Sequence, residues 1–217
     1  MPPHLCDGHD HDDTFEDLGL SLRPQIDFDG VKCLNEDFPG MGRGILKLHE
    51  ERLSAEPYLR SQEDDPELLL HIPFTEAVTI TKISIHSSPP SNIDDECKPP
   101  RTVKLFSNRD DIDFDMAREL TPHCQVDTLP PEHFTEGTLD YPLRPAGRFR
   151  NIDSLTLFFS DNYGSDDEVS TVITYIGLKG RGSGIKRTAV QCVYESRGMP
   201  EDHKTPGAEF GTKDEVG

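Results

Sequence analysis

The feature that most constrains the fold is a run of apolar residues that alternates with polar ones and then changes phase. Val78 and Ile80 occupy even positions, whereas Ile83 and Ile85 occupy odd positions. Alternation with a period of two is typical of a β-strand that buries one face. One extra residue near Thr81-Lys82 would return the later apolar side chains to the buried face, which is what a β-bulge does. The pattern therefore predicts a bulged strand.

Similar strand patterns recur along the chain, and polar, proline-rich segments separate them. β-Branched and aromatic residues dominate these patterns, as strands prefer. The expected strands lie at 68–72, 102–107, 154–160, 171–178 and 189–195. A short helix is expected at 45–53, with Pro57 marking its limit. Because long helical periods are absent, we expect an all-β fold, an antiparallel β-sandwich of jelly-roll type.

The two ends of the chain differ from its middle. Residues 1–20 are rich in Asp and His, and residues 197–217 combine Pro and Gly with charges. Both segments offer little to bury, so we expect disordered tails. The chain has 217 residues, of which 33% are hydrophobic. These values fit one domain, expected at 21–196, better than two.

The charge restricts the partners. The chain has 41 Asp and Glu against 22 Lys and Arg, a net charge of -19. Such a field repels phosphate groups, so nucleic acid and anionic membranes are poor partners. A basic patch on another protein, or a large complex, is a better one, and we expect the chain itself to be a monomer.

Localisation follows from the cysteines and the N-terminus. Five scattered cysteines without a CxxC pair suggest a reducing compartment. The N-terminus lacks the basic and apolar regions of a signal peptide. No apolar run approaches the roughly 18 residues of a membrane helix. We therefore expect a protein of the cytoplasm, of the nucleus or of both.

Two groups of residues have side chains of the kinds that bind metal ions. The N-terminal group is His4, Cys6, His9 and His11, whose side chains can bind Zn²⁺, Ni²⁺ or Cu²⁺. Structural zinc sites use regularly spaced ligand pairs, and ordering a tail costs entropy, so a solvated tail is favoured. The second group, 110–115, lacks the glycine and the final glutamate of a calcium loop. We predict no cofactor.

No pattern predicts catalysis. Cys124 beside His123 is the one Cys–His neighbour pair, and adjacency does not make a catalytic geometry. A Gly-x-Ser-x-Gly elbow is absent from the sequence. The run 180–184 looks like a phosphate loop but lacks the Walker lysine. Acidic neighbours disfavour reactive thiolates. We therefore predict no catalytic residues and no enzyme.

Runs of acidic residues are abundant in the expected loops. One interpretation is solvated loops that confer solubility; the other is an electrostatic docking surface for basic protein patches. The acidic residues that we predict to contact a partner are Asp94, Asp95, Glu96, Asp166, Asp167 and Glu168.

Several phrases, taken together and in order, resemble the PITH (proteasome-interacting thioredoxin) domain family over roughly residues 20–200. They are Cys33-Leu34-Asn35-Glu36, the segment Asp65 to Phe74, Val103 to Asn108, Asp113 to Ala117, Phe149 to Phe158, and Thr174 to Leu178. The resemblance implies a jelly-roll sandwich similar to galactose-binding-like domains, and a role at the regulatory particle of the 26S proteasome. It implies no catalytic residues.

Thioredoxin-linked members of that family carry an upstream redox domain with a CxxC pair. Nothing of the kind precedes residue 20, so the sequence resembles the stand-alone form. We expect a non-catalytic protein-interaction module that docks on the 26S proteasome regulatory particle or a related large complex. The alternatives are a carbohydrate- or small-molecule-binding β-sandwich and a thiol-redox accessory protein. The absence of Trp and the presence of only 5 Tyr argue against a sugar platform.

Overall fold

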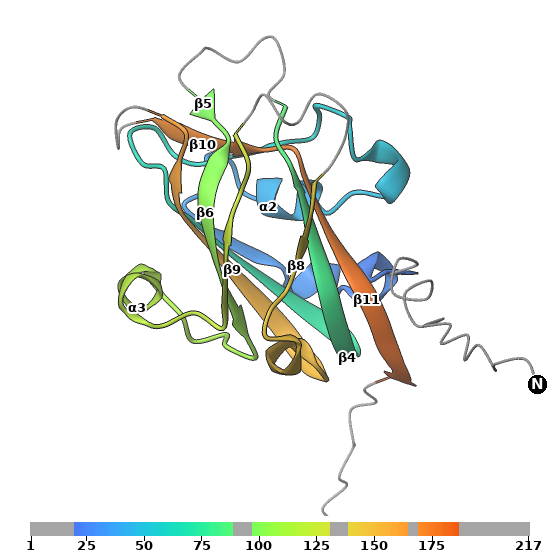
Figure 1. Ribbon diagram of the computed structural model, residues 1–217. Coiled ribbons are helices and arrows are strands. Elements are labelled where there is room, and N and C mark those ends of the chain that lie inside the picture. The colour runs from blue at the N-terminus through green and yellow to red at the C-terminus, as the bar shows by residue number, and fades with distance from the viewer. Residues whose placement is uncertain (1–19, 89–96, 131–138, 165–168, 187–217) are drawn as a thin grey trace, which may run out of the picture. The chain divides into compact units, whose positions relative to one another are not determined.

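The computed structural model describes residues 20–88, 97–130, 139–164 and 169–186 (Figure 1). Strands dominate this part of the chain. They are β1 (Leu20–Ser21), β2 (Lys32–Leu34), β3 (Leu59–Arg60), β4 (Leu68–His86), β5 (Cys97–Lys98), β6 (Pro100–Ser107), β7 (Cys124–Asp127), β8 (Leu139–Pro142), β9 (Ile152–Asn162), β10 (Ser170–Ile173) and β11 (Tyr175–Lys186). The helical elements are η1 (Arg23–Gln25), η2 (Phe28–Gly30), α2 (Met41–Gly44), η3 (His49–Glu51), α3 (Phe114–Glu119) and η5 (Ala146–Phe149).

The long strand β4 is shared by two layers. Its first part, through Pro73, pairs with β2 and β9, and β6 and β7 continue this first layer. Its last part, from Val78, pairs with β11 and β8, and β1 continues this second layer. All of these pairs are antiparallel. The result is the predicted β-sandwich.

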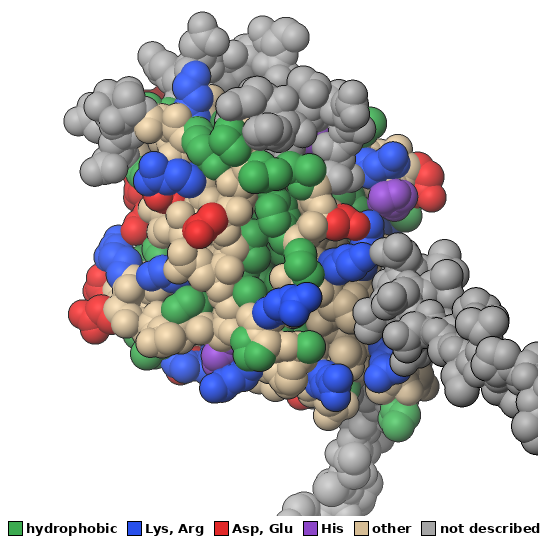
Figure 2. Space-filling view, viewed as in Figure 1, with side chains coloured by type: hydrophobic (Ala, Val, Ile, Leu, Met, Phe, Trp, Pro, Cys, Tyr) green, Lys and Arg blue, Asp and Glu red, His purple; other side chains and the backbone are tan. Residues whose placement is uncertain are grey.

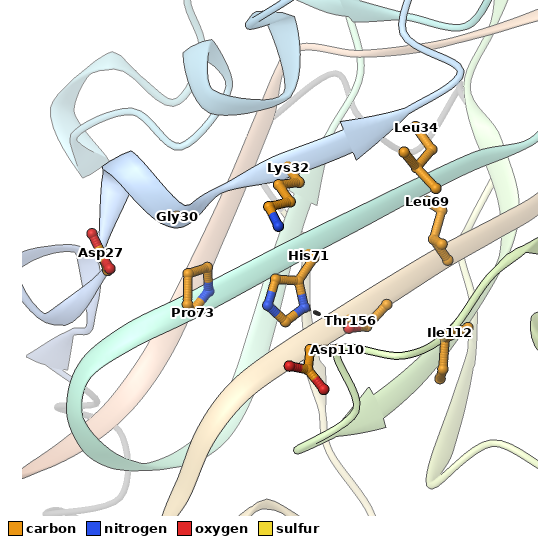
Figure 3. A pocket seen from close by; sticks show the side chains of 10 residues that line it. All are labelled: Asp27, Gly30, Lys32, Leu34, Leu69, His71, Pro73, Asp110, Ile112 and Thr156. Carbon is orange, nitrogen blue, oxygen red and sulfur yellow. Dashed lines mark hydrogen bonds between the residues drawn. The ribbon is translucent and has the colours of Figure 1, made fainter.

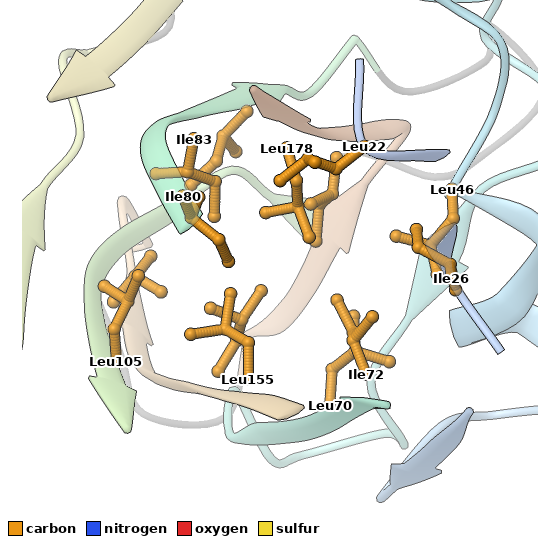
Figure 4. Close-up of a cluster of buried hydrophobic side chains, with 14 of the residues drawn as sticks. Leu22, Ile26, Leu46, Leu70, Ile72, Ile80, Ile83, Leu105, Leu155 and Leu178 are labelled. Carbon is orange, nitrogen blue, oxygen red and sulfur yellow. The ribbon is translucent and has the colours of Figure 1, made fainter. Parts of the chain in front are cut away.

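The core lies between the two layers (Figure 4). Leu70, Ile72 and Leu155 from the first layer face Ile80 and Ile83 from the second. Within the first part of β4 the even-numbered side chains enter this core, whereas Leu69 and His71 point to the opposite, outer side. This alternation follows from the pleat of a strand. It leaves the outer-face side chains, such as Leu69 and His71, outside the core, where they can line a binding site.

The predicted bulge is confirmed. Lys82 pairs with Lys179, but the next pair joins Ile80 to Gly180, so Thr81 is the extra residue. At this point the backbones come so close that a Cβ on Gly180 would lie 2.0 Å from the carbonyl oxygen of Thr79. The bulge therefore requires glycine opposite it.

The expected strand at 171–178 is two strands, broken at Thr174. The Thr174 backbone amide donates to the carbonyl of His86 at 2.9 Å. Before this break β10 forms a small separate sheet with β3 and β5, in which the pair of β10 and β5 is parallel. The remaining predicted strands at 68–72, 102–107 and 154–160 fall within β4, β6 and β9.

The expected helix at 45–53 is wrong. α2 ends at Gly44, and one turn of 3-10 helix follows at His49–Glu51. Between them Ile45 and Leu46 are 0% and 2% exposed because they turn into the core. Burial of two consecutive side chains overrides the helical propensity of the segment.

A second, smaller apolar cluster covers the outer face of the first layer. α3 packs there through Ala117 against Leu69, Phe106 and Phe158. The side chain of Asp113 caps α3 by accepting from the Met116 amide at 2.8 Å.

The aspartates of 110–115 have local roles. Asp111 pairs with Arg109 at 2.6 Å, and Asp115 pairs with Arg118 at 2.8 Å. Across the described ranges no three His, Cys, Asp or Glu side chains are placed to hold a metal ion. In the same ranges no helix is long and apolar enough to cross a membrane. The predicted strand at 189–195 lies outside the described residues, and the tail boundaries stay a prediction.

Candidate functional site

A pocket of about 310 Å³ lies on the outer face of the first layer, where β2, β4 and β9 run side by side (Figure 3). η2 borders it at one end, and the segment after β6 borders it at the other. Its lining residues are Asp27, Gly30, Lys32, Leu34, Leu69, His71, Pro73, Asp110, Ile112 and Thr156. We call it the His71 pocket.

Thr156 fixes the hydrogen position on His71. The Thr156 hydroxyl is buried and donates to the carbonyl oxygen of Arg109 at 2.6 Å. A hydroxyl has one hydrogen, so the same oxygen acts as acceptor for Nδ1 of His71, 2.9 Å away. His71 therefore carries its hydrogen on Nδ1, and Nε2 is the nitrogen left for other partners.

The surroundings keep His71 neutral. Burial lowers the pKa of its imidazole, Asp110 opposes this effect, and Lys32 adds to it. With the hydrogen on Nδ1, a neutral ring presents Nε2 as a hydrogen-bond acceptor. Within the described part of the chain, Nε2 has no hydrogen-bond partner. The site thus holds an acceptor available to a ligand.

Charges and apolar walls complete the pocket. The carboxylates of Asp27 and Asp110 add acceptors, and the amine of Lys32 is the cation of the lining. Figure 3 shows Lys32 and Asp110 on opposite sides of the His71 ring. The apolar walls are Leu34, Leu69, Pro73 and Ile112. Acceptors outnumber donors, so the arrangement suits a donor group with an apolar stem.

Local backbone features hold the border elements in place. Gly30 lets η2 approach β4, because a Cβ there would lie 2.7 Å from Cγ of Pro73. Asn108, with φ of 54°, accepts from the Asp153 amide at 2.7 Å and anchors the segment after β6 to the start of β9. Asn tolerates the positive φ at position 108, whereas glycine at position 30 allows the close approach to Pro73.

The turn after β2 is fixed in the same way. Asn35, with φ of 67°, donates to the carbonyl of Glu67 at 2.7 Å. The Glu36 carboxylate accepts from the amides of Gly40 and Gly42 at 2.7 and 2.8 Å. The phrase Cys33-Leu34-Asn35-Glu36 thus encodes a strand end and its turn, next to the pocket.

The structure does not test the site residues predicted from the sequence. The six acidic loop residues and the N-terminal metal-ligand types lie outside the described residues, so both stay predictions. Those residues are Asp94, Asp95, Glu96, Asp166, Asp167, Glu168, His4, Cys6, His9 and His11. Sequence reasoning missed His71, because 68–72 was interpreted only as a buried strand. The signal was its odd position, which places it on the outer face between Leu69 and Pro73.

Cys33 and Cys124 are not suited to nucleophilic chemistry. No disulfide joins Cys33, Cys97 and Cys124 to one another. Burial first, and then Glu36, raises the pKa of Cys33 well above its ordinary value, which disfavours the thiolate. Cys124 is part of the core, whereas Nδ1 of the adjacent His123 accepts from the Ser107 amide at 3.0 Å. This neighbour pair therefore forms no catalytic dyad.

The glycine-rich run 180–184 belongs to β11 and is not a phosphate loop. Gly180 and Gly182 pair with β4 residues in the second layer. This agrees with the interpretation from sequence, in which a nucleotide site was disfavoured.

Solved structures with the same fold support the architecture. CBM32-3 from a family 31 glycoside hydrolase of Clostridium perfringens superposes with a TM-score of 0.50 at 10% identity, covering 72% of this chain and 95% of that one. The CBM32-1 and CBM32-2 domains of Clostridium perfringens ZmpB give 0.51 at 10% identity, over 78% of this chain and 38% of that one. At such identity the likeness shows the fold alone. The fold is a jelly roll of galactose-binding-like type, as predicted.

Sequence comparison is more specific. "PITH domain-containing protein 1" of Dictyostelium discoideum is 34% identical over 203 residues, covering 93% of this chain and 94% of the relative. The protein of the same name from Homo sapiens is 34% identical over 197 residues, covering 88% and 85%. The family model described as "PITH domain" matches residues 12–198. The chain belongs to the PITH domain family.

Proposed function

We propose that the protein is a non-catalytic protein-interaction module, and that the His71 pocket holds an arginine or lysine side chain of its partner. The observation that carries this proposal is the neutral His71, which presents Nε2 as an acceptor between apolar walls and the carboxylates of Asp27 and Asp110.

The pocket lining matches both parts of a basic side chain, its charged end and its aliphatic stem. Hydrogen bonds between a cation and carboxylates are stronger than neutral ones, and Asp27 and Asp110 supply the carboxylates. The aliphatic stem of arginine or lysine packs on apolar surface, which Leu34 and Leu69 provide. Lys32 lies beside His71 and selects against a cation that enters from its side of the pocket.

The net charge of -19 adds long-range attraction for a basic partner. Such a field mainly raises the association rate. We retain the acidic residues of 94–96 and 166–168 as a proposed contribution to this attraction. Reversing the charge of either group is expected to slow association and to leave the pocket unchanged.

The partner that we propose is the 26S proteasome regulatory particle or a related large complex. We also propose that the chain binds it as a monomer, in the cytoplasm, the nucleus or both. Membership in the PITH domain family supports this choice. The relatives are named for a domain and not for a reaction. Turnover in an insulin-reduction assay would overturn the non-catalytic assignment.

Carbohydrate binding is less well supported. Sugar sites commonly use an aromatic platform, and no Trp, Tyr or Phe is among the described residues that line the His71 pocket. A glycan array that gave a specific hit, lost on substitution of His71, would favour this alternative over a basic side chain.

The test is a tagged pull-down from soluble cell extract at low and moderate salt, read by mass spectrometry. The wild-type chain is compared with an Asp27→Asn/Asp110→Asn variant. A Glu50→Gln/Glu119→Gln variant makes the same change of charge at exposed positions outside the pocket. We expect stoichiometric recovery of regulatory-particle subunits by the wild type and the control, and loss with the pocket variant. Equal recovery of regulatory-particle subunits by all three chains would refute the proposal that the His71 pocket binds the partner.

A further inference from the structure

A group of cations gathers on the outer face of the second layer, although the chain as a whole is strongly acidic. Lys82 and Lys179 are paired across β4 and β11, and Arg181 pairs with Thr79 on the same strands. Their neighbours Ile80, Ile83 and Leu178 enter the core, so these cations point outward.

The segment around η5 brings two more cations to this surface. Arg144 follows β8, whose Pro142 pairs with Lys82. Arg150 precedes Asn151, whose amide donates to the hydroxyl of Thr79 at 3.4 Å, next to the strand position of Arg181. We call this set the basic face: Lys82, Arg144, Arg150, Lys179 and Arg181. Figure 2 shows Lys and Arg side chains in blue across the lower half of this view, over the region of β8 and β11.

One cation of the basic face, Lys179, is neutralised by a described carboxylate. The carboxylate of Asp140 accepts hydrogen bonds from Nζ of Lys179 and from the Ser84 hydroxyl, each at 2.5 Å. Burial works to raise the pKa of Asp140, but these two hydrogen bonds hold it below its ordinary value, so the carboxylate stays ionised and paired. Arg144, Arg150 and Arg181 form no salt bridge with any described residue. Among the described residues, these three arginines therefore give the basic face a positive excess.

A shallow hollow lies within the basic face, with a volume of about 700 Å³. Its apolar lining comes from Pro142, Leu143, Pro145 and Ala146, and its cations are Lys82 and Arg144. A surface of this kind matches a segment in which an apolar side chain is flanked by carboxylates. The apolar side chain would fill the hollow, and the carboxylates would meet the cations.

We propose that the basic face binds an acidic segment of a partner protein, with one apolar side chain of that segment seated in the hollow. A nucleic acid fits less well, because it has no aliphatic side chain to fill the apolar hollow. The His71 pocket faces outward from the first layer and the basic face from the second, so the two sites use different residues. The module would then contact partners of opposite charge on opposite sides.

The test uses a fluorescently labelled peptide of Asp and Glu with one central Leu, and measures anisotropy against the full chain. Arg144→Glu and Arg181→Glu are the face variants. Arg43→Glu is the control, because Arg43 is exposed and lies beside β2 in the first layer. We expect each face variant to weaken binding about three- to tenfold and their combination more than tenfold. The control should stay within about twofold.

Four further outcomes decide the proposal. Replacing the central Leu by Ala in the peptide should weaken binding severalfold; no change would refute the seated side chain. Thermal unfolding curves first establish that the control and the combined face variant are both folded. Equal binding of the peptide by these two variants would then refute the basic face as its binding site. Tighter binding of a single-stranded oligonucleotide than of the peptide would overturn a protein segment as the occupant. The Asp27→Asn/Asp110→Asn variant should bind the peptide as the wild type does, which separates this site from the His71 pocket.

Discussion

Replacement of Thr156 by valine tests the hydrogen-bond geometry beneath the His71 pocket. Valine has nearly the shape of threonine but lacks the hydroxyl, which here donates to the Arg109 carbonyl at 2.6 Å and accepts from Nδ1 of His71 at 2.9 Å. The side chain is 2% exposed, so water cannot readily replace the lost partner. The change removes two hydrogen bonds at once.

The magnitude follows from those two bonds. A protein hydrogen bond contributes about 0.5–1.5 kcal/mol net, and a buried group left without a partner costs about 1–3 kcal/mol. We expect Thr156→Val to lower the free energy of unfolding by about 1–3 kcal/mol, measured by urea denaturation. Thr156→Ser keeps the hydroxyl and serves as the matched control, because it loses only a methyl group, worth about 1 kcal/mol.

The same variant has a spectroscopic signature. In the wild type we expect ¹⁵N NMR to show His71 neutral and protonated on Nδ1 near pH 7. Thr156→Val should shift the ring toward the Nε2-protonated form, and Thr156→Ser should not. A wild-type ring already protonated on Nε2, or a valine variant as stable as the wild type, would refute the reasoning.

Three other predictions concern the fold. Gly180→Ala should lower the stability measured by thermal unfolding by about 1–3 kcal/mol, because the new Cβ would lie 2.0 Å from the Thr79 carbonyl oxygen. The control Gly147→Ala should be close to neutral, because nothing lies within 4 Å of its new Cβ. Asp113→Ala removes the cap of α3 and should cost about 0.5–2 kcal/mol, whereas Asp113→Asn should cost less; equal losses would contradict the cap. Burial lowers the pKa of three histidines below the ordinary 6.5. The unfolded chain then binds more protons below that value, so stability is complete above pH 6.5 and falls as the pH drops below it. Urea midpoints that rose between pH 6.5 and 5.5 would contradict this sign. These histidines are His71, His86 and His123.

Much of the fold could be predicted because local patterns carry it. The phase change between Ile80 and Ile83 predicts a bulge near Thr81-Lys82, and the strand register places it at Thr81. Alternation also located β6 and β9, because strands that bury one face must alternate. The break at Thr174 was not predicted, since it depends on hydrogen bonding to His86, 88 residues away. The helix expected at 45–53 failed for a similar reason, because burial of Ile45 and Leu46 is decided by the tertiary fold.

The site was harder to predict than the fold. The His71 pocket joins side chains from β2, β4, β9 and the segment after β6, so it exists only once the strand register is known. His71 and Thr156 are 85 residues apart, and no local motif connects them. The basic face has the same origin, because Lys82 and Lys179 become neighbours through pairing of β4 with β11. Composition, dominated by acidic residues, predicts a basic partner, but it indicates neither the His71 pocket nor the basic face.

The most direct measurement of the central claim is site-specific photo-crosslinking from the rim of the His71 pocket. Leu34 lines the pocket and is 46% exposed, and Leu48 is 48% exposed at a position outside the lining. A photoreactive residue replaces each in the full chain, the chain is illuminated in cell extract, and the crosslinked peptides are sequenced by mass spectrometry. We expect Leu34 to yield one peptide of a 26S regulatory-particle subunit with an arginine or lysine beside the crosslink. That product should vanish when Asp27→Asn/Asp110→Asn is added, and Leu48 should not yield it. The claim would be contradicted if Leu34 gave no defined product, or gave one that survives loss of both carboxylates.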